Sequence, residues 1–170
     1  KIGPDPRHWL GLQRTSTDGG RTWSAAKRLP DGLIGPVRSP PMQLRDGSLL
    51  SPSSTEDAGW RIHFERLEKS ASPNPARIEA IQPVLLPGPD GNLLALGRTR
   101  QDHVFATTSH DDGRHWQALR LLDLPNPNAA IDAVRLADGR YLMAFNPHVS
   151  GKDWWNGRDR LDIALSEDGE

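Results

Sequence analysis

The sequence predicts an all-β fold built from repeated small antiparallel sheets, and two observations carry the prediction. Short apolar runs recur along the 170 residues, separated by frequent glycines (16) and prolines (15). Runs of this kind with turn signals between them are typical of all-β domains. The second observation is a pair of internal repeats whose spacing matches a small sheet. No stretch of the chain has a convincing helical period.

The first repeat is a dipeptide turn. The pattern Asp-Gly-x-apolar-Leu occurs at residues 46–50, 90–94 and 138–142. An Asp-Gly pair between apolar runs is a strong signal for a tight β-hairpin. The copies start 44 and 48 residues apart, which is the length of one four-stranded propeller blade, about 40 to 50 residues.

The second repeat places aspartate, glycine and tryptophan in one turn. Residues 16–23 and 109–116 share Ser, Asp, Gly, Arg and Trp in the pattern S-x-D-x-G-x-x-W, and a third copy begins at Ser166. The carboxylate can accept hydrogen bonds from its own turn, glycine supplies a positive φ, and tryptophan is expected to bury its ring between sheets. We therefore interpret Asp18, Asp111 and Asp168 as residues that stabilise the fold rather than as catalytic acids.

This pattern resembles the Asp-box of sialidases (neuraminidases) and related BNR-repeat β-propellers, including the predicted bacterial neuraminidase branch. The resemblance implies a partial six-bladed propeller of about three to four blades, each a four-stranded antiparallel sheet. Residues 1–30 would form the outer half of one blade, 31–78 a second, 79–124 a third and 125–170 an incomplete fourth. An Asp-box expected near residues 64–72 is absent from the sequence.

A closed propeller needs four or more complete blades, so the chain is interpreted as a fragment of a single propeller domain. The formal net charge of -1 gives no support for nucleic acid as a partner. No apolar run approaches the roughly 20 residues that span a bilayer. Cysteine is absent and the six histidines show no metal-ligand spacing, so neither a metal nor another cofactor is expected.

Arginines are the first candidates for substrate binding. Sialidases hold the carboxylate of their sugar with three arginines from different blades, because planar guanidinium groups make bidentate bonds to carboxylates. By this resemblance Arg98 matches the second of them, with a plain surface role as the alternative, and Arg158 matches the third, with Arg160 as the register alternative. The first is expected outside this chain. Arg38 opens a segment similar to one in predicted bacterial neuraminidases and is a further candidate.

The spacing from each Asp-Gly turn identifies other polar positions at one end of the sheets, where a central site is expected. These positions differ from blade to blade: they are Ser54, Arg98 and Asn146, followed two residues later by Glu56, Arg100 and His148. Asn128 or Asp132 could point into the same mouth. The tryptophans of loop 147–157, Trp154 and Trp155, could stack on a sugar or simply anchor their own loop.

The catalytic groups depart from the family pattern. Sialidases use a tyrosine nucleophile, assisted by a glutamate and joined by an aspartate acid/base. The single tyrosine here, Tyr141, lies within a hairpin strand and is better explained as core. The assisting glutamate usually precedes a proline, but this chain has Gln82 there, and glutamine cannot act as a base. The catalytic residues therefore stay unknown, with Glu79 and Gln82 as candidates.

Three functions remain open. The first is a secreted or periplasmic sialidase-like exo-glycosidase that hydrolyses a terminal acidic or polar sugar from glycans. Arg98 and Arg158 would bind the anionic group, Gln82 and Asn146 would bond to hydroxyls, and loop 147–157 would wall the pocket. The second is a non-catalytic propeller that binds glycan or protein partners. The third is a polysaccharide lyase with a histidine or tyrosine base.

Overall fold

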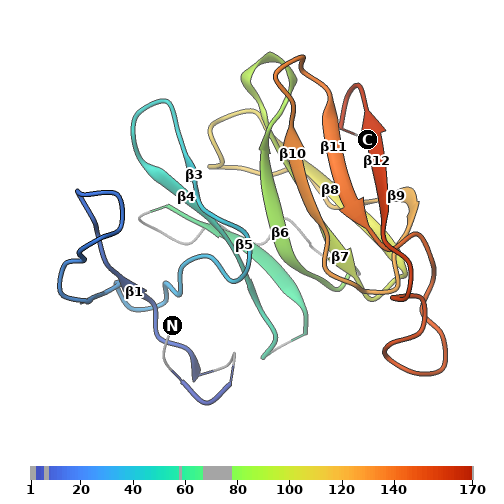
Figure 1. Ribbon diagram of the computed structural model, residues 1–170, viewed down its shortest axis with the longest axis horizontal. Helices are drawn as coiled ribbons and strands as arrows, with labels where there is room; N and C mark the ends of the chain where they lie inside the picture. Colours follow the sequence, from blue (N-terminus) through green and yellow to red (C-terminus); the bar gives the residue numbers. More distant parts are fainter. Residues whose placement is uncertain (1–2, 6–7, 58, 67–77, 170) are drawn as a thin grey trace.

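A computed structural model describes residues 3–5, 8–57, 59–66 and 78–169 (Figure 1). Their strands form four antiparallel sheets in chain order. Sheet 1 pairs β1 (Leu12–Gln13) with β2 (Lys27–Arg28). Sheet 2 contains β3 (Met42–Gln43), β4 (Leu49–Thr55) and β5 (Arg61–Glu65).

Sheet 3 is a complete four-stranded blade, and sheet 4 has three strands among the described residues. Sheet 3 contains β6 (Ala80–Pro87), β7 (Leu93–Thr99), β8 (His103–Ser109) and β9 (Arg120–Pro125). Sheet 4 contains β10 (Asp132–Arg135), β11 (Tyr141–Phe145) and β12 (Asp162–Ser166). Figure 1 shows sheet 1 on the left, sheet 2 next to it, and sheets 3 and 4 overlapping on the right. The predicted all-β, partial sialidase-type propeller is confirmed.

A single turn of 3₁₀-helix, Pro89–Gly91, joins β6 to β7 at one of the predicted Asp-Gly turns. No helix in the described part of the chain is long and apolar enough to cross a membrane. The absent Asp-box near residues 64–72 falls largely on residues 67–72, which lie outside the described ranges.

Two apolar cores lie between successive sheets, and β7 contributes to both. Side chains of a strand point alternately to its two faces. Leu93 and Ala95 accordingly pack with Phe64 and Phe105 in the core between sheets 2 and 3. Leu94 and Leu96 pack in the core between sheets 3 and 4. The apolar run after the Asp-Gly turn is therefore continuous because both faces of sheet 3 are covered.

The Asp-box of sheet 3 links it to sheet 2. The Asp111 carboxylate accepts hydrogen bonds from Ser109 Oγ at 2.9 Å and from the His115 N–H at 2.8 Å. The Trp116 ring donates to Gly113 O at 3.1 Å and stacks on Phe64 of sheet 2, with 3.8 Å between ring centroids. The box is thus a structural element, as predicted.

The Asp-box of sheet 1 is built in the same way but corrects one expectation. Asp18 accepts hydrogen bonds from the N–H groups of Arg21 and Thr22, each at 3.0 Å. Trp23, however, is 58% exposed instead of buried between sheets. Trp116 is covered because the preceding sheet supplies Phe64, whereas no described sheet precedes sheet 1.

The sheets have two different ends. The Asp-Gly turns and the Asp-boxes share one end, because the first residue of β7, Leu93, pairs with Ser109, and the first residue of β11, Tyr141, pairs with Ser166. The opposite end receives Arg98 near the close of β7, loop 126–131 between β9 and β10, and loop 147–157 between β11 and β12. We call this second end the mouth.

Candidate functional site

Three arginines from three sheets meet on one loop at the mouth. Arg98 Nη1 donates to Asn128 O at 2.7 Å, and Arg158 Nη2 donates to the same oxygen at 3.0 Å. Arg38, which precedes β3, donates through Nη1 to Ile131 O. Loop 126–131 therefore holds all three guanidinium groups. We call Arg38, Arg98 and Arg158 the arginine cluster.

Each arginine uses one terminal nitrogen on the loop and keeps the other available. Arg98 bonds only through Nη1, Arg158 only through Nη2 and Arg38 only through Nη1 among the described residues. The second terminal nitrogens are therefore unpaired in that part of the chain. A guanidinium held by one edge and free at another is preorganised to donate to a planar anion.

The cluster carries more positive than negative charge. Burial, followed by the neighbouring charge of Arg158, lowers the pKa of Arg98; Glu56 opposes this effect and Arg38 adds to it. Arginine nevertheless stays charged in proteins. The repulsion between these cations is relieved when an anion binds among them, so the electrostatics favour an anionic ligand.

The backbone beside the cluster is strained at two positions. Asn128 has a φ of 54°, and Gln82 has a φ of 55° at a bulge in the pairing of β6 with β7. For a glutamine a left-handed conformation costs about 1–2 kcal/mol, whereas asparagine adopts it more readily, and strained residues gather at functional sites. The Gln82 N–H donates to Ser54 Oγ at 3.3 Å, which ties the bulge to sheet 2.

The remaining predicted contact residues have different environments. Asn146 is buried, and its amide donates to Arg160 O at 2.6 Å. Asp132 is exposed at the start of β10 and accepts a hydrogen bond from the Ala133 N–H. His148 is exposed, with its Cβ beside Gly157. Asn146 is therefore engaged in holding loop 147–157, whereas Asp132 is open to solvent.

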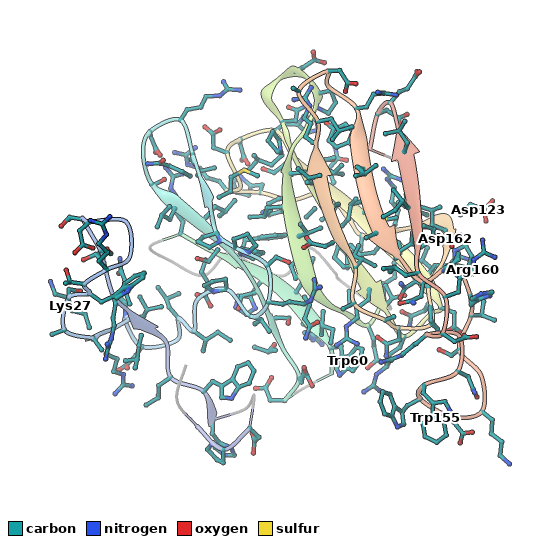
Figure 2. The ribbon with its side chains drawn as sticks, in the orientation of Figure 1. Lys27, Trp60, Asp123, Trp155, Arg160 and Asp162 are labelled. Atoms are coloured by element: carbon teal, nitrogen blue, oxygen red, sulfur yellow. The ribbon has the colours of Figure 1, made fainter. Side chains whose placement is uncertain are left out.

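Of the two arginines considered for the third position, only Arg158 joins the cluster. Arg160 makes a two-point ion pair with Asp162, at 2.7 Å for each contact. Figure 2 shows these two side chains at the outer edge of β12, above the loop that carries Trp155. The register alternative therefore belongs to the surface of sheet 4.

The candidates for catalysis are occupied or buried. Glu79 forms an ion pair with Arg100 at 3.6 Å. Tyr141 is 4% exposed, and its hydroxyl donates to Pro87 O at 3.0 Å. Tyr141 is thus a core residue, as the sequence indicated. Among the described residues, no group of three histidine, aspartate or glutamate side chains could hold a metal ion.

Aromatic side chains flank the mouth. Trp154 is 73% exposed, contacts Trp155 edge-on and lies 5.3 Å from the Arg158 guanidinium. Trp60, which sequence reasoning missed, lies beneath Arg100 at 4.3 Å and Arg98 at 5.5 Å. Figure 2 places Trp60 and Trp155 at the same end of the sheets. The sequence signal that could have identified Trp60 is its position directly before β5, in the connection from β4.

A buried acid that binds the segment preceding Arg38 was also missed. Glu65 and His63 are nearly inaccessible on β5, with 3.0 Å between Glu65 Oε1 and His63 Nε2. The Glu65 carboxylate accepts the N–H groups of Ile34 at 3.1 Å and Gly35 at 2.7 Å. Burial by itself raises the pKa of Glu65, but the bonds from His63, Ile34 and Gly35 outweigh it and lower that pKa overall. Glu65 therefore fixes the segment that leads to Arg38.

The chain was compared with protein families and solved structures. The family model of the BNR repeat-like domain matches residues 1–170. A protein of unknown function from Dyadobacter fermentans is 19% identical, with a TM-score of 0.64 over 80% of this chain and 44% of that one. No curated protein matches.

Two sialidase structures are also similar. The NanB sialidase of Streptococcus pneumoniae is 18% identical, with a TM-score of 0.65 over 91% of this chain and 25% of that one. The intramolecular trans-sialidase of Ruminococcus gnavus is 18% identical, with a TM-score of 0.66 over 91% and 35%. This chain thus spans less than half the length of each of these structures.

Proposed function

Since this chain belongs to the BNR repeat-like domain family, we propose that it forms the anion-binding part of a sialidase-like exo-glycosidase that hydrolyses a terminal acidic sugar from glycans. The observation that carries the proposal is the arginine cluster. Three guanidinium groups from three sheets each keep a terminal nitrogen unpaired among the described residues. A carboxylate is the sugar substituent whose charge and planarity suit this arrangement.

The geometry suggests a role for each part of the mouth. Arg98 and Arg158 approach each other on one carbonyl oxygen, so they would hold the two oxygens of a single carboxylate. Arg38 would add a third donor from sheet 2. Asp132, His148 and the tryptophans of loop 147–157 would face the rest of the sugar. The nucleophile and the acid/base are not assigned to residues of this chain.

A second function is favoured by a specific observation. Gln82 stands where sialidases have a glutamate base, and Tyr141 is buried and hydrogen-bonded in the core. A propeller with this cluster and no base would bind acidic glycans without cleaving them. Binding and turnover therefore have to be measured separately.

The test uses a panel of fluorogenic glycosides, sialosides and uronides included, with the full-length protein, its Arg98→Ala variant and an Arg140→Ala control. Arg140 pairs with Asp138 in a turn at the end opposite the mouth. We expect Arg98→Ala to reduce acidic-sugar turnover or affinity by about thirtyfold or more, because breaking a buried charged pair costs about 2–5 kcal/mol. The control should behave as wild type.

Two outcomes would change the assignment. Saturable binding of acidic sugars without any product would select the non-catalytic propeller. Binding and turnover that are unchanged in Arg98→Ala for every acidic sugar would contradict the proposed site. An unsaturated product absorbing in the ultraviolet would instead identify a lyase.

A further inference from the structure

Loop 126–131 determines the geometry of the arginine cluster. Asn128 O accepts one hydrogen bond from Arg98 and one from Arg158, at 2.7 and 3.0 Å. Two like charges bound to one oxygen have a separation set by the position of that oxygen. Ile131 O, three residues further along, receives Arg38. A displacement of this loop would move all three guanidinium groups at once.

The loop is in turn held by Asn126, which is fully buried. Its Oδ1 accepts the Ala129 N–H at 2.8 Å, and its main-chain oxygen accepts the Asn128 N–H at 2.7 Å. Its own N–H donates to Asp102 O in the β7–β8 hairpin, also at 2.8 Å. Asn126 thus anchors the loop to sheet 3 and closes the turn that presents Asn128 O.

The turn needs this anchor because Asn128 is held in a left-handed conformation, with a φ of 54°. Asparagine adopts that conformation more readily than most residues, but less readily than glycine, so the turn still has to be held by its hydrogen bonds. Without the Asn126 side chain, the buried Ala129 N–H loses its acceptor and the turn can relax. Relaxation would rotate the Asn128 carbonyl away from the two arginines.

We propose that Asn126 is the positioning residue of the arginine cluster, acting through the carbonyl groups of loop 126–131. As a determinant of acidic-sugar affinity this role rests on the proposed function, whereas its effect on the arginines does not. The anchor is also neutral. An asparagine supplies the acceptor oxygen without adding a negative charge beside three cations, which an aspartate would add at the expense of anion binding.

The test compares Asn126→Ala with Asn126→Ser and with a control, Thr107→Val, in the full-length protein. Serine can accept a local N–H bond through its hydroxyl oxygen, as asparagine does in turns, although more weakly. Thr107 is also buried, in β8, and its hydroxyl donates to Gln117 O at 2.7 Å, away from the mouth. The control therefore loses one buried hydrogen bond without touching loop 126–131.

Two readouts are needed. The first is the affinity for N-acetylneuraminate and glucuronate: Asn126→Ala should weaken it by about tenfold, equivalent to 1.4 kcal/mol, and Asn126→Ser should restore most of it. The second is the side-chain NMR spectrum of the arginines. Asn126→Ala should shift the Nε–H signals of Arg98 and Arg158 and speed rotation about their Nε–Cζ bonds, whereas Thr107→Val should leave both unchanged.

The two readouts test the proposed function and the positioning role of Asn126 separately. If the wild type binds neither sugar, the proposed function fails, and the arginine spectra alone decide the role of Asn126. If Asn126→Ala and Thr107→Val give the same arginine spectra, Asn126 does not position the cluster. Equal losses of affinity in Asn126→Ala and Asn126→Ser would also overturn the inference, because a side-chain acceptor would then be irrelevant.

Discussion

The two complete Asp-boxes offer an internal comparison, because the same tryptophan position is covered in one and open in the other. Trp116 stacks on Phe64 with centroids 3.8 Å apart and rings inclined by 16°, whereas Trp23 is 58% exposed. Each ring N–H donates to a glycine oxygen of its own turn, at 3.1 Å for Trp116 and 3.0 Å for Trp23. Trp116→Ala and Trp23→Ala therefore differ in packing and share the loss of one local hydrogen bond.

The difference in stability can be worked out from these contacts. Deleting a fully buried tryptophan costs about 3–5 kcal/mol. Because Trp116 is only partly buried, the packing lost in Trp116→Ala should cost about half of that, or about 2 kcal/mol. The ring stack adds about 1 kcal/mol, and the hydrogen bond adds about 1 kcal/mol in both variants. Trp116→Ala should then destabilise the chain by about 4 kcal/mol, and Trp23→Ala by about 1 kcal/mol.

Urea denaturation of the 170-residue chain, followed by far-ultraviolet circular dichroism, measures both values. The m value should stay constant, so that the shift in midpoint reports stability alone. Phe64→Leu, which removes the stacking partner but keeps an apolar side chain, serves as a check on the Trp116 contact. Equal free-energy losses in the two tryptophan variants, or a larger loss in Trp23→Ala, would refute the reasoning.

Two other predictions concern the site and its support. Arg158→Ala should weaken acidic-sugar binding by at least about tenfold. Arg160→Ala, which breaks only the ion pair with the partly exposed Asp162, should change the affinity by less than about twofold. Calorimetric titration measures both values, and a larger loss in Arg160→Ala than in Arg158→Ala would contradict the assignment of Arg158 to the site. Because the pKa of Glu65 is lowered in the folded chain from its ordinary value of 4.5, its stabilising contribution is complete above that value and is lost as the pH falls through the folded pKa. Glu65→Gln should therefore flatten the acid limb of a thermal-melting profile recorded from pH 6 to pH 2, roughly the range in which carboxylates titrate; an unchanged limb would contradict this role.

Local patterns in the sequence were sufficient to predict the Asp-Gly turns that precede β7 and β11 and the turn function of Asp18 and Asp111. These features depend on residues close in sequence, whose hydrogen-bonding and packing requirements are visible in the pattern itself. The burial of Trp23 was predicted wrongly for the opposite reason. The box fixes the turn, but the neighbouring sheet decides whether the ring is covered.

The arginines were partly predictable. Arg98 and Arg158 were identified by resemblance, and the register argument could not separate Arg158 from Arg160, because two residues differ by one full pleat of a strand. The shared carbonyl of Asn128 could not be foreseen, since it joins residues 30 apart in the chain. Glu65 and Trp60 gave no motif, because their roles depend on packing between sheets.

The Asp-Gly and Asp-box turns lie at one end of the sheets and the arginine cluster lies at the other, and this separation affects how the sequence can change during evolution. Every contact that closes an Asp-box lies at one end of the sheets, and every arginine of the cluster lies at the other. Substitutions and insertions in loops 126–131 and 147–157 can therefore accumulate without loosening the Asp-Gly and Asp-box turns, which connect strands within each sheet. Ligand preference and architecture therefore depend on different parts of the sequence in this scaffold, so the loops at the mouth can change while the turns are preserved.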